Sequence, residues 1–570
     1  MGSKSKFFDD VSIVLCGEAG QGIQTVEHLM TQTLKLSGYN VFSTQEYMSR
    51  IRGGNNSTSI RISSKRVTAP VNRIDILIPF GEGAISHINN RISNDTIIIG
   101  EEESFKNEYD GDNSISVPIS DIAMEVGGKI YANTVASALL LRLFDVDFEL
   151  FSNYLKKRFG GKDEQVVQRN IDSAKRGYEV SDKLLKDGKI EIQIKRNPEV
   201  EKEIIMDGLE ALSLGAIAGG CDFISFYPMS PSTVVAINLA QRSKEFGIVV
   251  EQAEDEISAM NMVVGASYAG ARALASTSGG GFALMVEAVS LSGMLECPVV
   301  IHLGQRPGPA TGLPTRTEQG DLNLALYAGH GEFPRAIFAP GTIEDMFYIT
   351  QNAFNLADKY QIPVFILTDQ YILEAHHNIT SIEPYRVKPE RFIIKTDEDY
   401  RRYRITENGV SPRGVPGYGD GLVVVDSDEH DEEGHITESM NVRKMMVNKR
   451  FRKLDLVKKD VLSPELIGNP NYKTLVIAWG SNYEVIKEAM DIVGRDDLAF
   501  LYFRQVYPIH PSIEEYLNRA EKTAIIENNF TSQFGNLIKL CTGIDIDKKF
   551  LKYDGMPFFV EEIAESLKEI

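Results

Sequence analysis

The chain has 570 residues, of which 43% are hydrophobic and 25% charged, as in globular proteins of roughly three or four domains. Its 80 acidic and 60 basic side chains give a formal net charge of -20, which argues against a nucleic acid or an anionic membrane as partner. No apolar run approaches the ~20 residues that cross a bilayer, and the first ten residues lack the apolar segment of a signal peptide. We therefore expect a cytoplasmic protein.

Residues 1–190 begin with a strand, a glycine-rich loop and a helix. The apolar run 11–16 ("VSIVLC") precedes "GEAGQG", and over 23–40 apolar residues recur at helical spacing. Two later apolar runs, 41–45 and 74–80, have the pattern of strands. This order predicts a βαβ start and a parallel sheet.

The loop "GEAGQG" places Gly17, Gly20 and Gly22 between a strand and a helix, where backbone N–H groups and the helix dipole favour a phosphate. Its spacing is G-x-x-G-x-G, and Ala19 stands where a dinucleotide fingerprint has its second glycine. A phosphate-bearing ligand, NAD and a purely structural tight turn all remain open for this loop.

A second loop in this region, 50–56, carries Arg50 and Arg52 followed by two glycines and two asparagines, just before a strand. Such a loop can present donors to an anion. A hairpin turn with solvated arginines explains the same residues equally well.

Residues 191–203 are charged and broken by Pro198, and we expect them to be a linker. From 204 to 385, strand-like and helix-like runs alternate, which is typical of a doubly wound sheet. Five runs have the strand pattern: 223–228, 247–253, 272–278, 298–304 and 363–369.

Polar or glycine-rich stretches follow the first four of these runs: "YPMSPST" at 227–233, "EQAEDE" at 251–256, "SGGG" at 278–281 and "QRPGPATGLPTRTEQGD" at 305–321. Ligands of open α/β sheets gather outside the carboxyl ends of the strands. We therefore expect Ser230, the 251–256 acids, the 278–281 loop and Arg306 to lie together.

The segment 391–439 has neither helical nor strand periodicity, so it is either functional or disordered. Its "DSDEHDEEGH" offers metal-ligand residue types, but the spacing fits no zinc pattern, and we expect no metal there. Strand and helix patterns alternate again over 472–570.

The four cysteines, at positions 16, 221, 297 and 541, are far apart in the chain. An iron–sulfur cluster or zinc site needs closely spaced thiolates such as C-x-x-C. If the protein takes part in redox chemistry, we expect its metal centre on another chain.

The motifs "YPMSPST", "EDEISAMNMVVGASYAGARA", "TSGGGFALMVEA" and "QRPGPATGLPTRTEQGDL" resemble, in this order, the α subunit of 2-oxoacid:ferredoxin oxidoreductases. "GEAGQGIQTVE" and "MSRIRGG" resemble the γ domain of that family, here fused ahead of α. The resemblance implies a multidomain α/β fold with five parts: a γ-type Rossmann-like domain (1–190), the linker (191–203), a thiamine-diphosphate pyrimidine-binding domain (204–385), an irregular connecting segment (386–471) and a transketolase C-terminal-like domain (472–570).

The resemblance also implies an enzyme that splits a 2-oxoacid with thiamine diphosphate, transfers the acyl group to coenzyme A and passes two electrons to ferredoxin. Ser230 stands where threonine is common in the family, and Leu209 where asparagine is usual. The fused architecture and "YPMSPST" favour 2-oxoglutarate over pyruvate. Two alternatives are a non-catalytic assembly or regulatory subunit and an NAD-dependent dehydrogenase.

Site residues follow from the same resemblance. Glu256 aligns with the glutamate whose carboxyl group shares a proton with ring nitrogen N1′ of thiamine, whereas Glu254 and Asp255 only complement a helix dipole. Arg306 is the candidate for the substrate carboxylate, since a guanidinium binds it through two parallel hydrogen bonds, and Ser230 and Thr315 would donate further ones. The remaining candidates are Tyr227, Pro228, Ser278, Gly279 and Gly280 for thiamine, and Gly17, Gly20, Gly22 and Arg52 for coenzyme A.

A diphosphate and Mg²⁺ domain and a cysteine-ligated [4Fe-4S] cluster are not visible in this sequence. The resemblance implies that both lie on a separate β subunit, so that this chain forms half of an active site. We expect a dimer of αβ units.

Overall fold

The computed structural model describes residues 5–49, 54–109 and 111–570, so Arg50 and Arg52 lie outside the described residues. The chain divides into two compact units. The first, here the N-terminal unit, consists of 1–206, 374–381 and 559–561. The second, here the larger unit, consists of 207–373, 382–558 and 562–570.

The N-terminal unit is built on an eight-stranded sheet of order β7-β6-β5-β2-β4-β3-β16-β9. Alternate side chains of its central strand β2 are buried on opposite faces: Ile13 and Leu15 in one core, Val14 and Cys16 in another. Its strands are β2 (Asp10–Glu18), β3 (Asn40–Glu46), β4 (Asn55–Ser63), β5 (Ile76–Pro79), β6 (Ile97–Gly100), β7 (Ser114–Ser116), β9 (Ile204–Asp207) and β16 (His376–Ile379).

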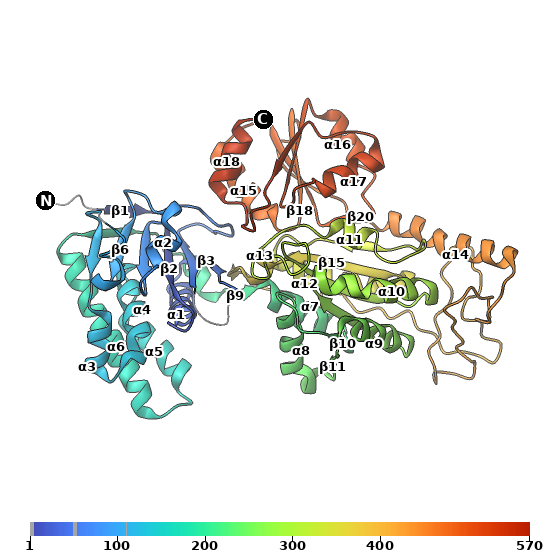
Figure 1. Ribbon diagram of the computed structural model, residues 1–570, viewed down its shortest axis with the longest axis horizontal. Coiled ribbons are helices and arrows are strands. Elements are labelled where there is room, and N and C mark those ends of the chain that lie inside the picture. The colour runs from blue at the N-terminus through green and yellow to red at the C-terminus, as the bar shows by residue number, and fades with distance from the viewer. Residues whose placement is uncertain (1–4, 50–53, 110) are drawn as a thin grey trace. The chain divides into compact units, whose positions relative to one another are not determined.

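Helix α4 (Ala132–Leu143) packs on both α1 (Ile23–Leu36) and α6 (Glu164–Lys186) in this unit (Figure 1). The expected strand, loop and helix at 11–40 are all present, and β2 and β3 run parallel to each other, but they are not neighbours in the sheet. Strand β4 lies between β2 and β3 and is antiparallel to both. Residues 47–54 are too short for the crossover that parallel neighbours need, so β3 and β4 pair as a hairpin.

The stretch expected to be a linker contains regular elements. Strand β8 (Ile190–Gln193) pairs in parallel with β1 (Ser5–Phe8). A 3-10 helix η4 (Pro198–Lys202) follows, capped by the side chain of Asn197 and anchored by the buried Val200.

The larger unit contains a seven-stranded sheet of order β11-β10-β12-β13-β15-β14-β20 (Figure 1). All pairs from β11 to β14 are parallel, and only β20 is antiparallel to its neighbour. This confirms the predicted doubly wound sheet. The strands are β10 (Phe223–Phe226), β11 (Val249–Gln252), β12 (Ala273–Thr277), β13 (Val299–Gln305), β14 (Ala336–Phe338), β15 (Pro363–Asp369) and β20 (Gln505–Tyr507).

A second sheet of the same unit has the order β17-β19-β18-β21-β22. One continuous apolar core joins the two sheets, since Val263 and Ile301 belong to the same buried cluster as Trp479 and Leu501. The strands are β17 (Glu465–Gly468), β18 (Thr474–Trp479), β19 (Leu498–Phe503), β21 (Lys522–Glu527) and β22 (Lys548–Leu551).

The segment 391–439 contains isolated bridges but no helix or strand, and helix α14 (Met440–Lys459) follows it. Both are anchored by a buried ion cluster. The Glu296 carboxylate receives Lys449 Nζ at 2.6 Å and contacts Lys453, while Arg402 donates to the backbone oxygen of Glu296 at 2.7 Å. These cations hold the pKa of Glu296 well below its usual range, and burial lowers the pKa of Lys453 to about 7.

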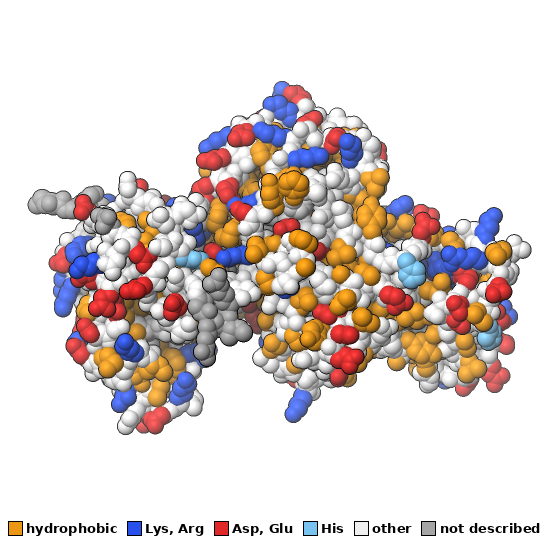
Figure 2. Space-filling view, in the orientation of Figure 1, with side chains coloured by type: hydrophobic (Ala, Val, Ile, Leu, Met, Phe, Trp, Pro, Cys, Tyr) orange, Lys and Arg blue, Asp and Glu red, His pale blue; other side chains and the backbone are white. Residues whose placement is uncertain are grey.

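None of the helices within residues 5–49, 54–109 and 111–570 has both the length and the apolar content of a membrane span. On the face shown in Figure 2, lysines, arginines and carboxylates are scattered among hydrophobic and other uncharged side chains.

Candidate active site

Four parallel neighbouring strands end at one edge of the seven-stranded sheet, and each is followed by one of the loops singled out in the sequence. Ser230 follows β10, Glu256 follows β11, Ser278 follows β12 and Arg306 follows β13. The topology thus places the four loops at the carboxyl ends of the strands, where open α/β sheets bind ligands.

Glu256 is the first residue of α9 (Glu256–Tyr268). The preceding Asp255 is the N-cap, and its side chain accepts a hydrogen bond from Ser258 N at 2.7 Å, while Glu254 is exposed. Glu256 itself is 4% exposed, and its Oε1 is buried with no hydrogen-bond partner among the described residues. Burying a carboxyl oxygen without a hydrogen-bond partner destabilises the folded protein. The position of Glu256 Oε1 therefore indicates a bound ligand or a catalytic function.

The three consecutive glycines begin helix α10 (Gly279–Leu295), which packs on α9. A Cβ atom at position 281 would lie 2.6 Å from Glu256 Oε1, so a side chain there would displace the carboxyl group. Ser278 is the N-cap but makes no capping bond, and its buried Oγ has no partner among the described residues. The turn therefore presents a second unsatisfied polar atom.

Arg306 is half-buried and donates from Nη1 to the backbone oxygen of Ser230 at 2.8 Å. Burial lowers the pKa of this guanidinium, and the nearby Asp321 opposes that shift. The Ser230 side chain is exposed, as are Tyr227 and Pro228, and Thr315 is partly buried. The structure thus joins the β10 and β13 loops directly through Arg306.

The loop that carries Arg306 is tied to the C-terminal sheet by the fully buried Gln319. Gln319 Nε2 donates to Trp479 O at 3.0 Å, and its Oε1 accepts from Asn482 Nδ2 and from Asn528 N, each at 3.1 Å. Region 472–570 therefore positions this loop.

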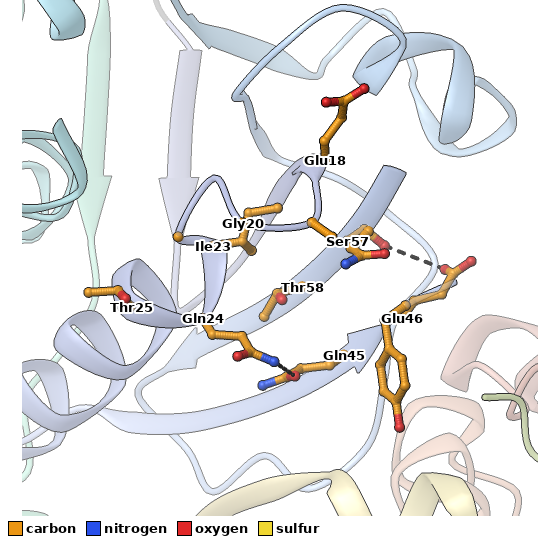
Figure 3. A pocket seen from close by; sticks show the side chains of 13 residues that line it. Glu18, Gly20, Ile23, Gln24, Thr25, Gln45, Glu46, Ser57 and Thr58 are labelled. Carbon is orange, nitrogen blue, oxygen red and sulfur yellow. Dashed lines mark hydrogen bonds between the residues drawn. The ribbon is translucent and has the colours of Figure 1, made fainter. Parts of the chain in front are cut away.

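In the N-terminal unit, the loop between β2 and α1 has Gly20 at φ 93° and Gly22 at φ 83°, a region that favours glycine. Gly22 is the N-cap of α1, and no side chain caps that helix. A cavity of about 280 Å³ lies on one side of the loop, lined also by Gln45 and Glu46 (Figure 3).

A cavity of about 440 Å³ includes Gly20 and Gln21 on its lining, together with Lys129 and Asn133. A Cβ at position 22 would overlap the Asn133 side chain, which forces glycine there. Among the described residues that line the two cavities, Lys129 is the only lysine or arginine, so the cavity that contains it is the better fit for an anionic ligand.

Three residues around the site escaped the sequence analysis: Gly281, Gln319 and Asp321. Gly281 was visible as the last of three glycines, and Asp321 as an acid at the end of the loop, but the sequence does not show that Gly281 faces Glu256 or that Asp321 faces Gly279. In the segment 391–439, Asp431, Glu433 and His435 lie close together, but Asp431 Oδ1 already accepts three backbone N–H groups of its own turn.

Comparisons with known proteins match most of the chain. A family model described as "Pyruvate flavodoxin/ferredoxin oxidoreductase, thiamine diP-bdg" matches residues 214–449, and one described as "Pyruvate ferredoxin/flavodoxin oxidoreductase" matches 12–180. The 2-oxoacid:ferredoxin oxidoreductase subunit alpha of a Sulfolobus species is 31% identical over 98% of this chain and 97% of its own. The chain belongs to the 2-oxoacid:ferredoxin oxidoreductase family.

Within this family the chain is an α subunit of an oxidoreductase. A solved 2-oxoglutarate:ferredoxin oxidoreductase from Magnetococcus marinus, with 2-oxoglutarate, coenzyme A and succinyl-CoA bound, is 29% identical with a TM-score of 0.90, over 98% of this chain and 99% of that one. The 2-oxoglutarate synthase subunit KorA of Archaeoglobus fulgidus is 30% identical over 64% of this chain and 98% of its own.

Proposed function

We propose that this chain supplies the pyrimidine-binding half of a thiamine-diphosphate site. Together with a separate β chain, it would convert a 2-oxoacid and coenzyme A into an acyl-CoA and CO₂ while two electrons reduce ferredoxin. The substrate we favour is 2-oxoglutarate. Its support comes from the names of the Magnetococcus and Archaeoglobus relatives and from the motif "YPMSPST".

The observation that carries this proposal is the buried Glu256 Oε1, which has no hydrogen-bond partner among the described residues. It lies next to Gly281, at the carboxyl-terminal edge of the parallel strands. A thiamine pyrimidine offers a ring nitrogen that would satisfy this oxygen through a shared proton, and Ser278 Oγ, at the start of α10, is a further unpartnered polar atom. The residues present therefore fit the cofactor.

Each site residue has a role in this proposal. Thiamine diphosphate, when bound, supplies the nucleophilic carbon for the 2-oxo group. Glu256 holds a proton at Oε1 against the cofactor's ring nitrogen, and Arg306 binds the substrate carboxylate with hydrogen bonds from Ser230 and Thr315. The turn of Ser278, Gly279 and Gly280, with Tyr227 and Pro228, would line the thiamine side.

The diphosphate, its Mg²⁺ and a [4Fe-4S] cluster are assigned by this proposal to the β subunit, in a dimer of αβ units. The cysteines of this chain support that division. Three of the four are buried, and burial raises the pKa of both Cys16 and Cys221 to about 12, so they stay as thiols. A cluster also needs several thiolates close together, and these cysteines are far apart in the chain.

The purified chain alone should be colourless and free of iron, because four scattered thiols cannot hold a cluster. Iron analysis and the visible spectrum test this. A stoichiometric iron–sulfur absorption band on the isolated chain would contradict it.

Coenzyme A should contact the glycine loop, because the uncapped start of α1 and Lys129 can meet its phosphates. Gly20→Asp adds a negative charge where a side chain meets nothing within 4 Å. We expect it to raise the half-saturating coenzyme A concentration roughly tenfold, the effect of about 1.4 kcal/mol, and to leave 2-oxoacid saturation unchanged.

Gly20→Asn is the matched control, since asparagine has the same size and similar tolerance of positive φ but no charge. Arg52→Ala probes the second candidate contact. Unchanged coenzyme A dependence in a Gly20→Asp, Arg52→Ala double variant would remove both loops from the proposal.

The experiment that tests the substrate is a panel of 2-oxoglutarate, pyruvate, branched-chain and aryl 2-oxoacids on the complex reconstituted with its β chain. The highest kcat/KM should belong to 2-oxoglutarate. A higher value for another member of the panel would reassign the substrate.

A further inference from the structure

Gln533 holds the backbone on both sides of Asp321, at the end of the loop that follows β13. Its Nε2 donates to Gly320 O at 2.7 Å, and its Oε1 accepts from Asn323 N at 2.8 Å. Asn323 lies in the first turn of α11 (Leu322–Leu326), whose N-cap Asp321 makes no side-chain capping bond with any described residue. Gln533 therefore acts as the cap of this helix, from a distant part of the chain.

Gln533 is itself oriented by a buried carboxylate. It begins helix α17 (Gln533–Thr542), and its N–H donates to Asn529 Oδ1 at 3.2 Å. Glu527, fully buried at the end of β21, organises this turn. Its two oxygens accept hydrogen bonds from Asn529 Nδ2, Ser532 Oγ, Phe534 N, Gly535 N and Trp479 Nε1. These bonds lie within region 472–570, so they orient Gln533 before any ligand binds.

The loop that Gln533 holds is closed at its base beside Arg306. Asp321 N donates at 3.0 Å to Oε1 of Gln305, the last residue of β13 and the one before Arg306. Between these ends the loop lies against the first turn of α10, with Ala310 O 3.6 Å from the place that a Cβ of Gly280 would take. A shift of the backbone at Asp321 would therefore disturb both the base of the loop and its packing on α10.

We propose that Gln533 is a positioning residue for the 305–321 loop, so that region 472–570 sets the affinity for the 2-oxoacid. The proposal rests on the proposed function, because it needs Arg306 and Thr315 to bind the substrate. Gln533 acts only through the loop backbone. Without its two hydrogen bonds, the loop populates arrangements in which Arg306 and Thr315 do not meet the same carboxylate, and substrate binding must select the ordered arrangement.

This mechanism predicts a change in affinity rather than in turnover. If the ordered arrangement falls to about a tenth of the population, the apparent dissociation constant rises roughly tenfold. A saturating substrate restores the ordered arrangement, so the chemical step then proceeds as in wild type.

The test is steady-state kinetics of the reconstituted αβ complex with 2-oxoglutarate, for wild type and Gln533→Met. Methionine has a similar length but neither donates to Gly320 O nor accepts from Asn323 N. The half-saturating 2-oxoglutarate concentration should rise roughly tenfold. The value of kcat should stay within about threefold of wild type and thiamine diphosphate affinity within about twofold, since the substitution touches neither Glu256 nor the α10 turn.

Hydrogen exchange of the same complex adds a readout that a general loss of stability would not reproduce. In Gln533→Met, amides of residues 305–323 should exchange faster than in wild type. Saturating 2-hydroxyglutarate, which keeps the substrate carboxylates and lacks the reactive carbonyl, should return them to the wild-type rate.

Gln361→Met is the matched control. Gln361 is also a buried glutamine of the larger unit, but its Nε2 donates to Ser411 O at 2.6 Å and its Oε1 accepts from Arg402 Nη1 at 2.9 Å, so it holds the segment 391–439. Its loss should lower thermal stability and leave half-saturation within about twofold of wild type.

Gln533→Glu keeps the acceptor for Asn323 N and loses the donor to Gly320 O, so it should change half-saturation in the same direction if the methionine variant does not assemble. Wild-type half-saturation in a Gln533 variant that assembles would overturn the proposal, and so would an equal rise in Gln361→Met. Failure of the proposed function would look different, because the wild-type complex would then oxidise no 2-oxoacid.

Discussion

Glu256→Gln should lower kcat of the reconstituted complex roughly 10²–10⁴-fold, the usual contribution of a positioned proton-handling group. The amide keeps the size of the carboxyl group, so packing against Gly281 is preserved, but it cannot hold and release a proton at Oε1. Since this oxygen has no partner among the described residues, the substitution breaks no hydrogen bond shown in the chain. Thermal stability should stay close to that of wild type.

Glu254→Gln is the matched control. Glu254 is exposed and lies two residues earlier, ahead of the same helix, so its loss should change the rate less than twofold. The assay is 2-oxoacid-dependent dye reduction with the β chain present. Equal rates for wild type and Glu256→Gln would favour a non-catalytic assembly or regulatory subunit.

Arg306→Ala should raise the half-saturating 2-oxoacid concentration and lower turnover, with a combined loss of about 2–4 kcal/mol in transition-state stabilisation. The guanidinium is half-buried and already oriented by its bond to Ser230 O, so truncation leaves the substrate carboxylate without its partner. Steady-state kinetics over a range of 2-oxoacid concentrations measure both effects.

Arg306→Lys should restore only part of the loss, because a point charge cannot reproduce two parallel hydrogen bonds. Thiamine diphosphate affinity should barely change, since its anionic groups are assigned to the β chain. An alanine variant that loses the cofactor but keeps its substrate dependence would show that Arg306 serves the cofactor or a subunit contact.

Much of this site could be predicted from local sequence patterns. Parallel strands in a doubly wound sheet all end at one edge, so identifying the strands at 223–226, 249–252, 273–277 and 299–305 was enough to bring their loops together. The resemblance to the family, rather than a local pattern, singled out Glu256 among its acidic neighbours, which the structure shows as an exposed residue and a helix cap. Its catalytic role stays a prediction.

Other features depended on tertiary contacts that no local pattern records. Strand β4 lies between β2 and β3 because it pairs with β3 as a hairpin and with β2 on its other side, and an alternation of strands and helices cannot show this insertion. Helix α14 is rich in lysine and arginine, so it lacks a clear apolar face, and it is held instead by the distant Glu296. Asp321 stands where an aspartate ordinarily caps a helix. The structure shows that Gln533, more than 200 residues later, accepts the hydrogen bond of Asn323 N instead.

The most direct test of the central claim is acyl-CoA formation coupled to dye reduction by this chain with and without its β partner, in the presence of thiamine diphosphate, Mg²⁺, 2-oxoglutarate and coenzyme A. We predict no activity for either chain alone, and activity for the mixture that requires both the 2-oxoacid and coenzyme A. Full activity of the β chain in the absence of this one, or a mixture that reduces dye without consuming a 2-oxoacid, would contradict the assignment of half of the active site to this chain.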